Sequence, residues 1–307
     1  MHREPGTPVP TGNQRPVDTA LVGFIHRHPL GAFFAWFFTV GQLFAFTPIL
    51  IDTPLPPQVF IVGSTLIGLL LPTLVITRIV DGPAALRSLW QRAIDVRVSL
   101  AWYALALLAL PLLAVAISVA FLGAPTGLTP SVLGWAVAAN FLLPLLFTFA
   151  PNNWWEEVAW QGFVQDRLRA RRGPLRAALI TAPLFALQHV ALVVGNSLVA
   201  GVAVLVLLAV LAVPFRFLTG WVYHRTGSLF LVGLIHGVGN AVAGGSGFQD
   251  GLLARLYPGQ QLAGVAHLLA LAVIGLIVVV ATRGRLGAAR RDRLADAAPE
   301  PAVPVAR

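Results

Sequence analysis

Long apolar runs separated by short polar segments dominate the chain. A helix that crosses the roughly 30 Å hydrocarbon core of a bilayer needs about 20 mainly apolar residues, at a rise of about 1.5 Å each. Eight stretches fit or approach this length, and the seventh is short and rich in glycine. They cover residues 29–51, 58–77, 98–122, 131–150, 175–195, 197–215, 228–243 and 261–281. The pattern predicts an all-α, polytopic integral membrane bundle of about eight transmembrane helices.

The two ends of the chain differ from this bundle. Residues 1–28 contain proline, threonine and arginine, and their one apolar run, residues 20–25, is far too short to span a bilayer. Residues 283–307 consist largely of alanine, arginine, aspartate and proline. We therefore predict disordered tails at 1–28 and 283–307, flanking a transmembrane bundle at 29–282.

Composition supports a membrane protein and excludes several kinds of chemistry. Hydrophobic residues make up 57% of the chain and charged residues 11%, with a mean hydropathy of +0.80. Soluble domains carry about 25% charged residues, so an ordinary globular protein is excluded. The chain has no cysteine, which excludes disulfides, thiol nucleophiles and cysteine-bound metals.

The net charge of +9 comes from arginines that flank the apolar stretches. Eight spans place both termini on one side of the membrane, and every arginine except Arg255 then falls on that side. Loops on the cytoplasmic side retain basic residues, so we predict cytoplasmic termini, with the plasma membrane as the location. This distribution accounts for the charge, and no nucleic-acid partner is expected.

Three polar motifs interrupt the apolar pattern. They are EEVAWQG at 156–162, after the fourth stretch, FALQH at 185–189, in the fifth, and HGVGN at 236–240, in the seventh. Ionisable groups inside a bilayer are costly, so each motif is a candidate functional site. Hydrogen bonding within the bundle is the alternative interpretation of each motif taken alone.

The spacing within the motifs suggests different roles for neighbouring residues. Glu156 and Glu157 point about 100° apart on a helix, so one can face a cavity while the other faces a neighbouring helix. His236 and Asn240 are four residues apart and lie on one helix face, where two donors suit an oxyanion. His189 is expected near the bilayer centre, 13 residues beyond Arg176.

Together, the ordered motifs resemble those of a known family. The order EExxx(R)G, then FxxxH, then HxxxN in a later span is similar to that of the intramembrane endopeptidases named after CAAX proteases and bacteriocin-processing enzymes. The match covers residues 152–243 and implies a protease-like core at about 130–245. It implies an endopeptidase that hydrolyses peptide bonds of a membrane-associated peptide or protein, within the lipid bilayer and in a cavity open to the cytoplasm. No oligomeric state follows from it.

The resemblance also implies roles for individual residues. Glu156 would activate the water, and His189 would help to position or deprotonate it. Glu157 would orient neighbouring groups, while His236 and Asn240 would stabilise the tetrahedral oxyanion. No cofactor is favoured. A zinc-dependent version would use Glu156, His189 and His236, although the chain contains no HExxH helix.

One position departs from the family pattern. The family motif has arginine where this chain has Gln161, so Glu157 lacks a charged partner one helical turn away. We expect Glu157 to be protonated unless Arg167, Arg169 or Arg225 pairs with it.

The sequence is also compatible with two rival functions. The departure at Gln161 motivates a catalytically inert family member that acts as a membrane scaffold or an immunity-type partner. A small transporter with Glu156 and His189 as a proton relay is the second rival, but the chain shows no inverted repeat.

Overall fold

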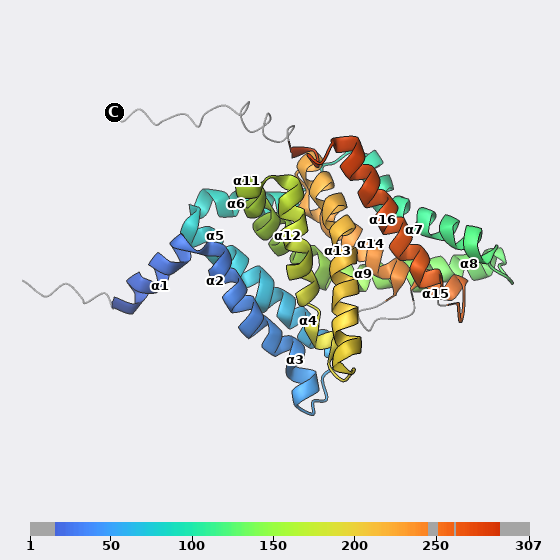
Figure 1. The fold of residues 1–307 in the computed structure, drawn as a ribbon, viewed down its shortest axis with the longest axis horizontal. Coiled ribbons are helices and arrows are strands. Elements are labelled where there is room, and N and C mark those ends of the chain that lie inside the picture. Colours follow the sequence, from blue (N-terminus) through green and yellow to red (C-terminus); the bar gives the residue numbers. More distant parts are fainter. Residues whose placement is uncertain (1–15, 245–250, 261, 289–307) are drawn as a thin grey trace, which may run out of the picture.

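The computed structural model describes residues 16–244, 251–260 and 262–288 (Figure 1). Over these ranges the chain forms helices and no strand. The prediction of an all-α protein is therefore confirmed for this part of the chain.

The first two apolar stretches form a helical hairpin. The first run contains α2 (Pro29–Trp36), the π-helix η1 (Phe37–Gly41) and α3 (Gln42–Leu50). The second contains α4 (Pro57–Gly63), the π-helix η2 (Ser64–Leu70) and α5 (Leu71–Val80). The runs meet at Gly41 and Gly68, where a Cβ on Gly68 would lie 2.5 Å from the Cα of Gly41. Side chains larger than hydrogen would prevent this approach, which fixes the position of η2 and its Thr65.

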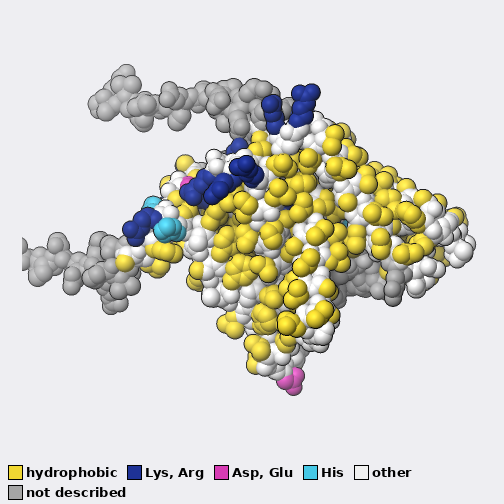
Figure 2. Space-filling model, in the orientation of Figure 1, with side chains coloured by type: hydrophobic (Ala, Val, Ile, Leu, Met, Phe, Trp, Pro, Cys, Tyr) yellow, Lys and Arg dark blue, Asp and Glu magenta, His cyan; other side chains and the backbone are white. Residues whose placement is uncertain are grey.

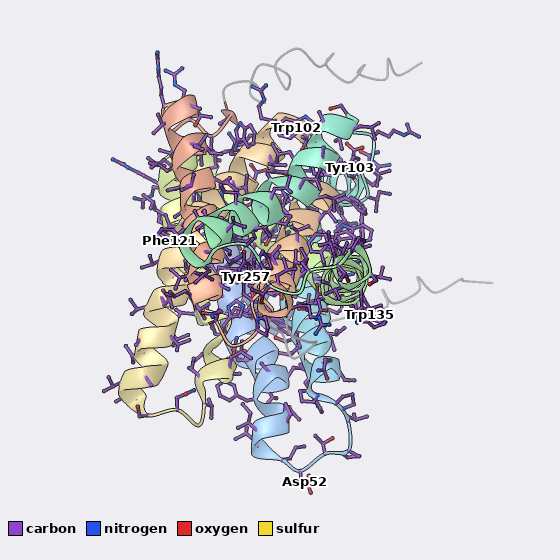
Figure 3. The ribbon with its side chains drawn as sticks, turned by 90° about the vertical axis from the view of Figure 1, so that its right-hand side faces the viewer. Asp52, Trp102, Tyr103, Phe121, Trp135 and Tyr257 are labelled. Atoms are coloured by element: carbon purple, nitrogen blue, oxygen red, sulfur yellow. The ribbon has the colours of Figure 1, made fainter. Side chains whose placement is uncertain are left out.

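Two further helices follow this hairpin. Helix α6 (Gly82–Ala93) is amphipathic and leads into α7 (Leu100–Leu122), which contacts α14 and α16. At the far end of α7, the hydroxyl of Tyr257 donates a hydrogen bond of 3.0 Å to the carbonyl of Gly123. Tyr257 is labelled in Figure 3.

A single helical run then extends from Pro130 to Arg172. It contains α8 (Pro130–Val137), η3 (Ala138–Leu142), α9 (Leu143–Thr148), η4 (Phe149–Asn153), α10 (Trp154–Ala159), η5 (Trp160–Gln165) and α11 (Asp166–Arg172). Segments η3, η4 and η5 are π-helices, and Pro151 lies within η4. Each π turn shifts the backbone hydrogen bonds from i→i+4 to i→i+5 without ending the helix. Such turns are frequent at functional sites. Helix α10, which carries both glutamates, lies between two of them.

The C-terminal half completes the bundle. It contains α12 (Pro174–Leu187), the 3₁₀ turn η6 (Val190–Val193), α13 (Leu198–Thr226), α14 (Leu229–Ala243), α15 (Leu252–Leu256) and α16 (Leu262–Thr282). Helix α13 packs against α12 and α16, and α14 packs against α7 and α10. Most side chains of α14 are buried, so this helix forms the centre of the bundle.

Small residues on α14 bring it close to the long helical run. A Cβ on Gly233 would lie 2.6 Å from the Cα of Trp154, and one on Gly237 would lie 2.8 Å from a methyl group of Leu145. Glycine removes this obstacle, as in other close helix crossings in membranes. His236 is therefore held beside the helix that carries Glu156.

The eight predicted stretches each correspond to a helical segment, but not all are of spanning length. Six helical runs among the described residues are long and apolar enough to cross a membrane. The fifth and seventh stretches form α12 and α14, with only 14 and 15 residues. The fifth was expected to continue to Gly195; it ends instead at Leu187, in a turn that contains His189.

Hydrophobic side chains cover most of the surface visible in Figure 2, as expected for a bundle immersed in lipid. Arginines gather at one end of the molecule in this view. Asp52 lies at the opposite end, beyond the tip of the first hairpin (Figure 3). The chain is thus an integral membrane protein with a marked charge asymmetry between its two ends.

Both predicted tails contain ordered residues. Residues 16–27 form helix α1 (Pro16–Arg27), so the expectation of a disordered tail is wrong for this segment. After α16, the amide of Leu286 donates to Thr282 Oγ1, and its carbonyl oxygen lies 2.8 Å from Nδ1 of His224 on α13. These contacts fix residues 283–288, whereas 1–15 and 289–307 lie outside the described residues.

Candidate active site

Glu156 is a buried carboxylate with two distinct oxygens. Its Oε1 accepts hydrogen bonds from Asn152 Nδ2 at 2.9 Å and from Gln188 Nε2 at 2.8 Å, and Thr65 Oγ1 lies 3.4 Å away. Its Oε2 lies 3.6 Å from Nδ1 of His236. Amide donors therefore orient one oxygen, and the other remains available to a water molecule or a substrate.

Glu157 points away from this position and forms a buried ion pair. Arg216 donates from Nη1 to Oε2 at 2.8 Å and from Nη2 to Oε1 at 2.7 Å. Both side chains have no exposed surface. The two glutamates face different neighbours, as predicted from their 100° separation, and the paired hydrogen bonds fix the Glu157 carboxylate.

Aromatic rings enclose the guanidinium of Arg216. Its central carbon lies 4.2 Å from the centroid of the Phe185 ring and 4.7 Å from that of Phe215. Such contacts stabilise a cation that has lost its water. The two Nη hydrogen bonds give the close geometry that a buried charge pair requires, while Nε of Arg216 has no hydrogen-bond partner among the described residues.

This pair corrects two expectations. Glu157 was expected to be protonated for lack of a charged partner, and Arg216 supplies that partner. The candidate partners proposed from the sequence do not: Arg167 pairs with Asp81, Arg169 pairs with Asp166, and Arg225 is exposed. Arg216 was assigned to a cytoplasmic loop, but it lies inside α13, with ten further helical residues after it.

His236 stands between the two carboxylates. Its Nδ1 lies 3.0 Å from Oε1 of Glu157 and 3.6 Å from Oε2 of Glu156. The shorter contact is close but not aligned as a hydrogen bond. The rings of Phe185 and Phe215 pack against the imidazole with centroid separations of 5.6 and 5.1 Å. The same two rings therefore hold both His236 and Arg216.

His189 enters the site from the turn after α12. Its Nδ1 lies 3.2 Å from the carbonyl oxygen of Phe185, so Nε2 is the nitrogen left for other partners. Asn240 lies one turn after His236 on α14, as its spacing predicted. Its Nδ2 donates to Oδ1 of Asn153 at 3.3 Å.

Two cavities meet at these residues. The first, called here the Glu156 cavity, has a volume of about 100 Å³ and is lined by Glu156, His189, His236 and Asn240 together with Thr65, Asn152, Asn153 and Gln188. The second, called the α16 cavity, has a volume of about 250 Å³ and lies between α12, α13, α14 and α16. His189, His236 and Asn240 line both. Glu157 lines neither cavity and lies behind His236.

The arrangement does not fit the alternative zinc site. Among the described residues, no group of three or more His, Cys, Asp or Glu side chains is placed to hold one ion. The set of Glu156, His189 and His236 is thus brought together without the geometry of a metal site.

Sequence reasoning missed two residues that complete the site. Gln188 donates to Glu156, while its own Oε1 accepts a hydrogen bond of 2.5 Å from the indole of Trp160. Gln188 lies inside the FALQH motif, directly before His189. Arg216 could have been detected as a lone charge with apolar residues on both sides, FRFL, rather than as the end of a span.

Comparison with known proteins adds a family to this geometry. Residues 137–242 match the family model described as type II CAAX prenyl endopeptidase Rce1-like. This segment runs from the end of α8 to α14 and contains all five predicted site residues. The resemblance inferred from the motifs is confirmed. No curated protein matches the chain.

Proposed function

Because residues 137–242 match the family model of a CAAX prenyl endopeptidase, we propose that the chain is an intramembrane endopeptidase in which Glu156 activates a water molecule. The observation that carries this proposal is the asymmetry of the Glu156 carboxylate. One oxygen is held by Asn152 and Gln188, and the other faces a polar cavity beside His236. A general base needs this combination of fixed position and free lone pair.

The reaction follows from the groups at the Glu156 cavity. Glu156 removes a proton from water as the water oxygen attacks the carbonyl carbon of the scissile peptide. His189 helps to position the water. The carbonyl becomes a tetrahedral oxyanion, which His236 and Asn240 stabilise by donating hydrogen bonds. The C–N bond then breaks, and the departing amine takes the proton from Glu156.

Glu157 and Arg216 take part in this reaction indirectly, through their contact with His236. Their ion pair places a carboxylate oxygen 3.0 Å from Nδ1 of His236. That contact favours a proton on Nδ1, and donation to the oxyanion from Nε2 then uses the ring protonated on both nitrogens. Glu157 is therefore a positioning residue, which acts through His236. The absence of arginine at Gln161 no longer argues for an inert protein, because Arg216 supplies the missing charge.

The substrate is proposed from the chemistry of the two cavities and from the family. The α16 cavity is mainly apolar and adjoins the polar groups, which suits a peptide with an apolar or lipidated segment beside its scissile bond. The family model is described as a CAAX prenyl endopeptidase. In a CAAX motif, a cysteine near the C-terminus carries the prenyl lipid. An S-farnesylated C-terminal peptide is thus the first substrate to test. We place its access on the arginine-rich, cytoplasmic side of a plasma membrane.

The test is hydrolysis of this peptide by the full chain in lipid nanodiscs. Glu156→Gln keeps the shape and loses the base, so turnover should fall by at least about 10²-fold. Asp52→Asn removes an exposed carboxylate at the far end and should leave turnover unchanged. Equal turnover in Glu156→Gln and the wild type would refute the mechanism. A folded wild type that cleaves neither this peptide nor a membrane-anchored peptide library would favour the inert scaffold.

A further inference from the structure

The α16 cavity contains a polar group that the proposed reaction does not use. Its walls are mostly leucine, alanine and phenylalanine side chains from α12, α13, α14 and α16. The polar side chains among them are His189, His236 and Asn240, which belong to the candidate site, and His267. His267 is carried by α16, outside the segment that matches the family.

His267 is buried without a hydrogen-bond partner for its ring. The residue is 8% exposed, and its Nδ1 is fully buried with no partner among the described residues. Its neighbours on the same wall, Leu268 and Leu271, offer no polar atom. An unsatisfied buried polar group lowers stability, so its presence calls for an explanation outside the folded chain.

The position of His267 is fixed by the packing of its helix. Two turns further along α16, a Cβ on Gly275 would lie 2.4 Å from Cβ of Pro214 on α13. This close contact anchors α16 against the helix that carries Phe215 and Arg216. The imidazole is therefore held in the cavity wall by a rigid element, as a preformed binding group requires.

We propose that His267 is a substrate-binding residue, whose imidazole hydrogen bonds to a main-chain peptide group of the substrate. This inference rests on the proposed function. Nδ1 has no exposed surface, so Nε2 is the ring nitrogen that a peptide in the cavity can reach. According to the tautomer, Nε2 donates to a peptide C=O or accepts from a peptide N–H. The apolar wall around it covers the adjoining substrate side chain. His267 thereby aligns the peptide so that its scissile bond reaches His189, His236 and Asn240.

The experiment measures binding separately from cleavage. The full chain carrying Glu156→Gln, in nanodiscs, is titrated with the fluorescent S-farnesylated peptide. His267→Leu in this background keeps the volume and removes the hydrogen bond, so the dissociation constant should rise about tenfold. His267→Gln retains a donor and an acceptor near the position of Nε2 and should bind within about threefold of the parent.

Ester analogues identify the partner of His267. Peptides in which one amide at a time is replaced by an ester lose an N–H donor and carry a weaker carbonyl acceptor. An ester at one position of the peptide should weaken its binding to the parent protein about tenfold. The same ester should leave binding to His267→Leu unchanged, because that variant has already lost the hydrogen bond; the four dissociation constants form a double-mutant cycle. Leu268→Ala is the matched control on the same wall: it changes cavity volume and should retain the ester sensitivity.

Stability separates binding from a structural role. Because His267 has an unpartnered nitrogen, His267→Leu should unfold at the same temperature as the parent or above it. A lower melting temperature with unchanged binding would show that the side chain only supports the fold. Unchanged binding with intact hydrolysis overturns this inference alone. A wild type that neither binds nor cleaves the peptides overturns the proposed function and, with it, this inference.

Discussion

Arg216 on α13 and Glu157 on α10 form two hydrogen bonds, of 2.8 and 2.7 Å, in a place where neither side chain has exposed surface. The pair joins segments 59 residues apart in the chain. It also positions the carboxylate that contacts His236. Desolvating both groups is costly, so the arrangement persists because the geometry is bidentate and two aromatic rings cover the guanidinium.

Removing one member of this pair should be severe. Arg216→Gln leaves Glu157 buried without a counter-charge, and we expect a loss of about 3 to 5 kcal/mol in unfolding free energy. Turnover should fall as well, because Glu157 no longer positions His236. The double variant Glu157→Gln with Arg216→Gln removes both charges of this pair and should recover much of the stability without the activity. Unfolding in detergent and peptide hydrolysis measure the two effects, and an unchanged unfolding transition in Arg216→Gln would contradict the account.

The positive charge that pairs with Glu157 can be moved from position 216 to position 161 by substitution. The side chain of Gln161 is fully buried, and neither amide atom has a partner among the described residues. Gln161→Arg alone would bring a second buried cation to a carboxylate that is already paired, so it should destabilise the protein by several kcal/mol. In the Arg216→Gln background, the same change restores a partner one turn from Glu157 and should raise both stability and turnover. Turnover and melting temperature of the four proteins test this, and additive losses would disprove the exchange.

Gln188 should matter for catalysis rather than for substrate binding. Gln188→Met removes the donor to Oε1 of Glu156 and leaves the indole of Trp160 unpaired. A less constrained base should lower kcat about tenfold while KM changes little. Gln42→Met is the matched control, since Gln42 donates to the backbone oxygen of Gln188 and not to its side chain. A KM effect without a kcat effect would assign Gln188 to substrate binding instead.

The charge asymmetry predicts the orientation in the membrane. Arginines gather at the end of the molecule opposite Asp52 (Figures 2 and 3). A reporter fused after Arg285 should therefore be cytoplasmic, and one inserted at Asp52 should be extracytoplasmic. Activity-dependent topology reporters distinguish the two sides. The reverse result at either position would remove the cytoplasmic active site from the proposal.

The sequence was sufficient to predict the helical membrane bundle, because hydropathy and arginine placement act locally along the chain. It also indicated Glu156, Glu157, His189, His236 and Asn240 as candidate site residues, since polar groups are unusual in apolar stretches. It did not predict the lengths of α12 and α14. Their ends depend on a turn around His189 and on packing inside the bundle, not on hydropathy alone.

The tertiary structure decided how these residues are used. The sequence predicts that Arg216 follows the end of a span. Only the packing of the helices shows that it lies inside α13 and neutralises the charge of Glu157. In the same way, His267 lies far beyond the motifs, yet α16 brings it to their cavity. The physical reason is that burial and charge pairing are properties of neighbouring helices, whereas hydropathy belongs to each segment by itself. The sequence alone determined which groups are chemically unusual, and the fold determined which of them meet.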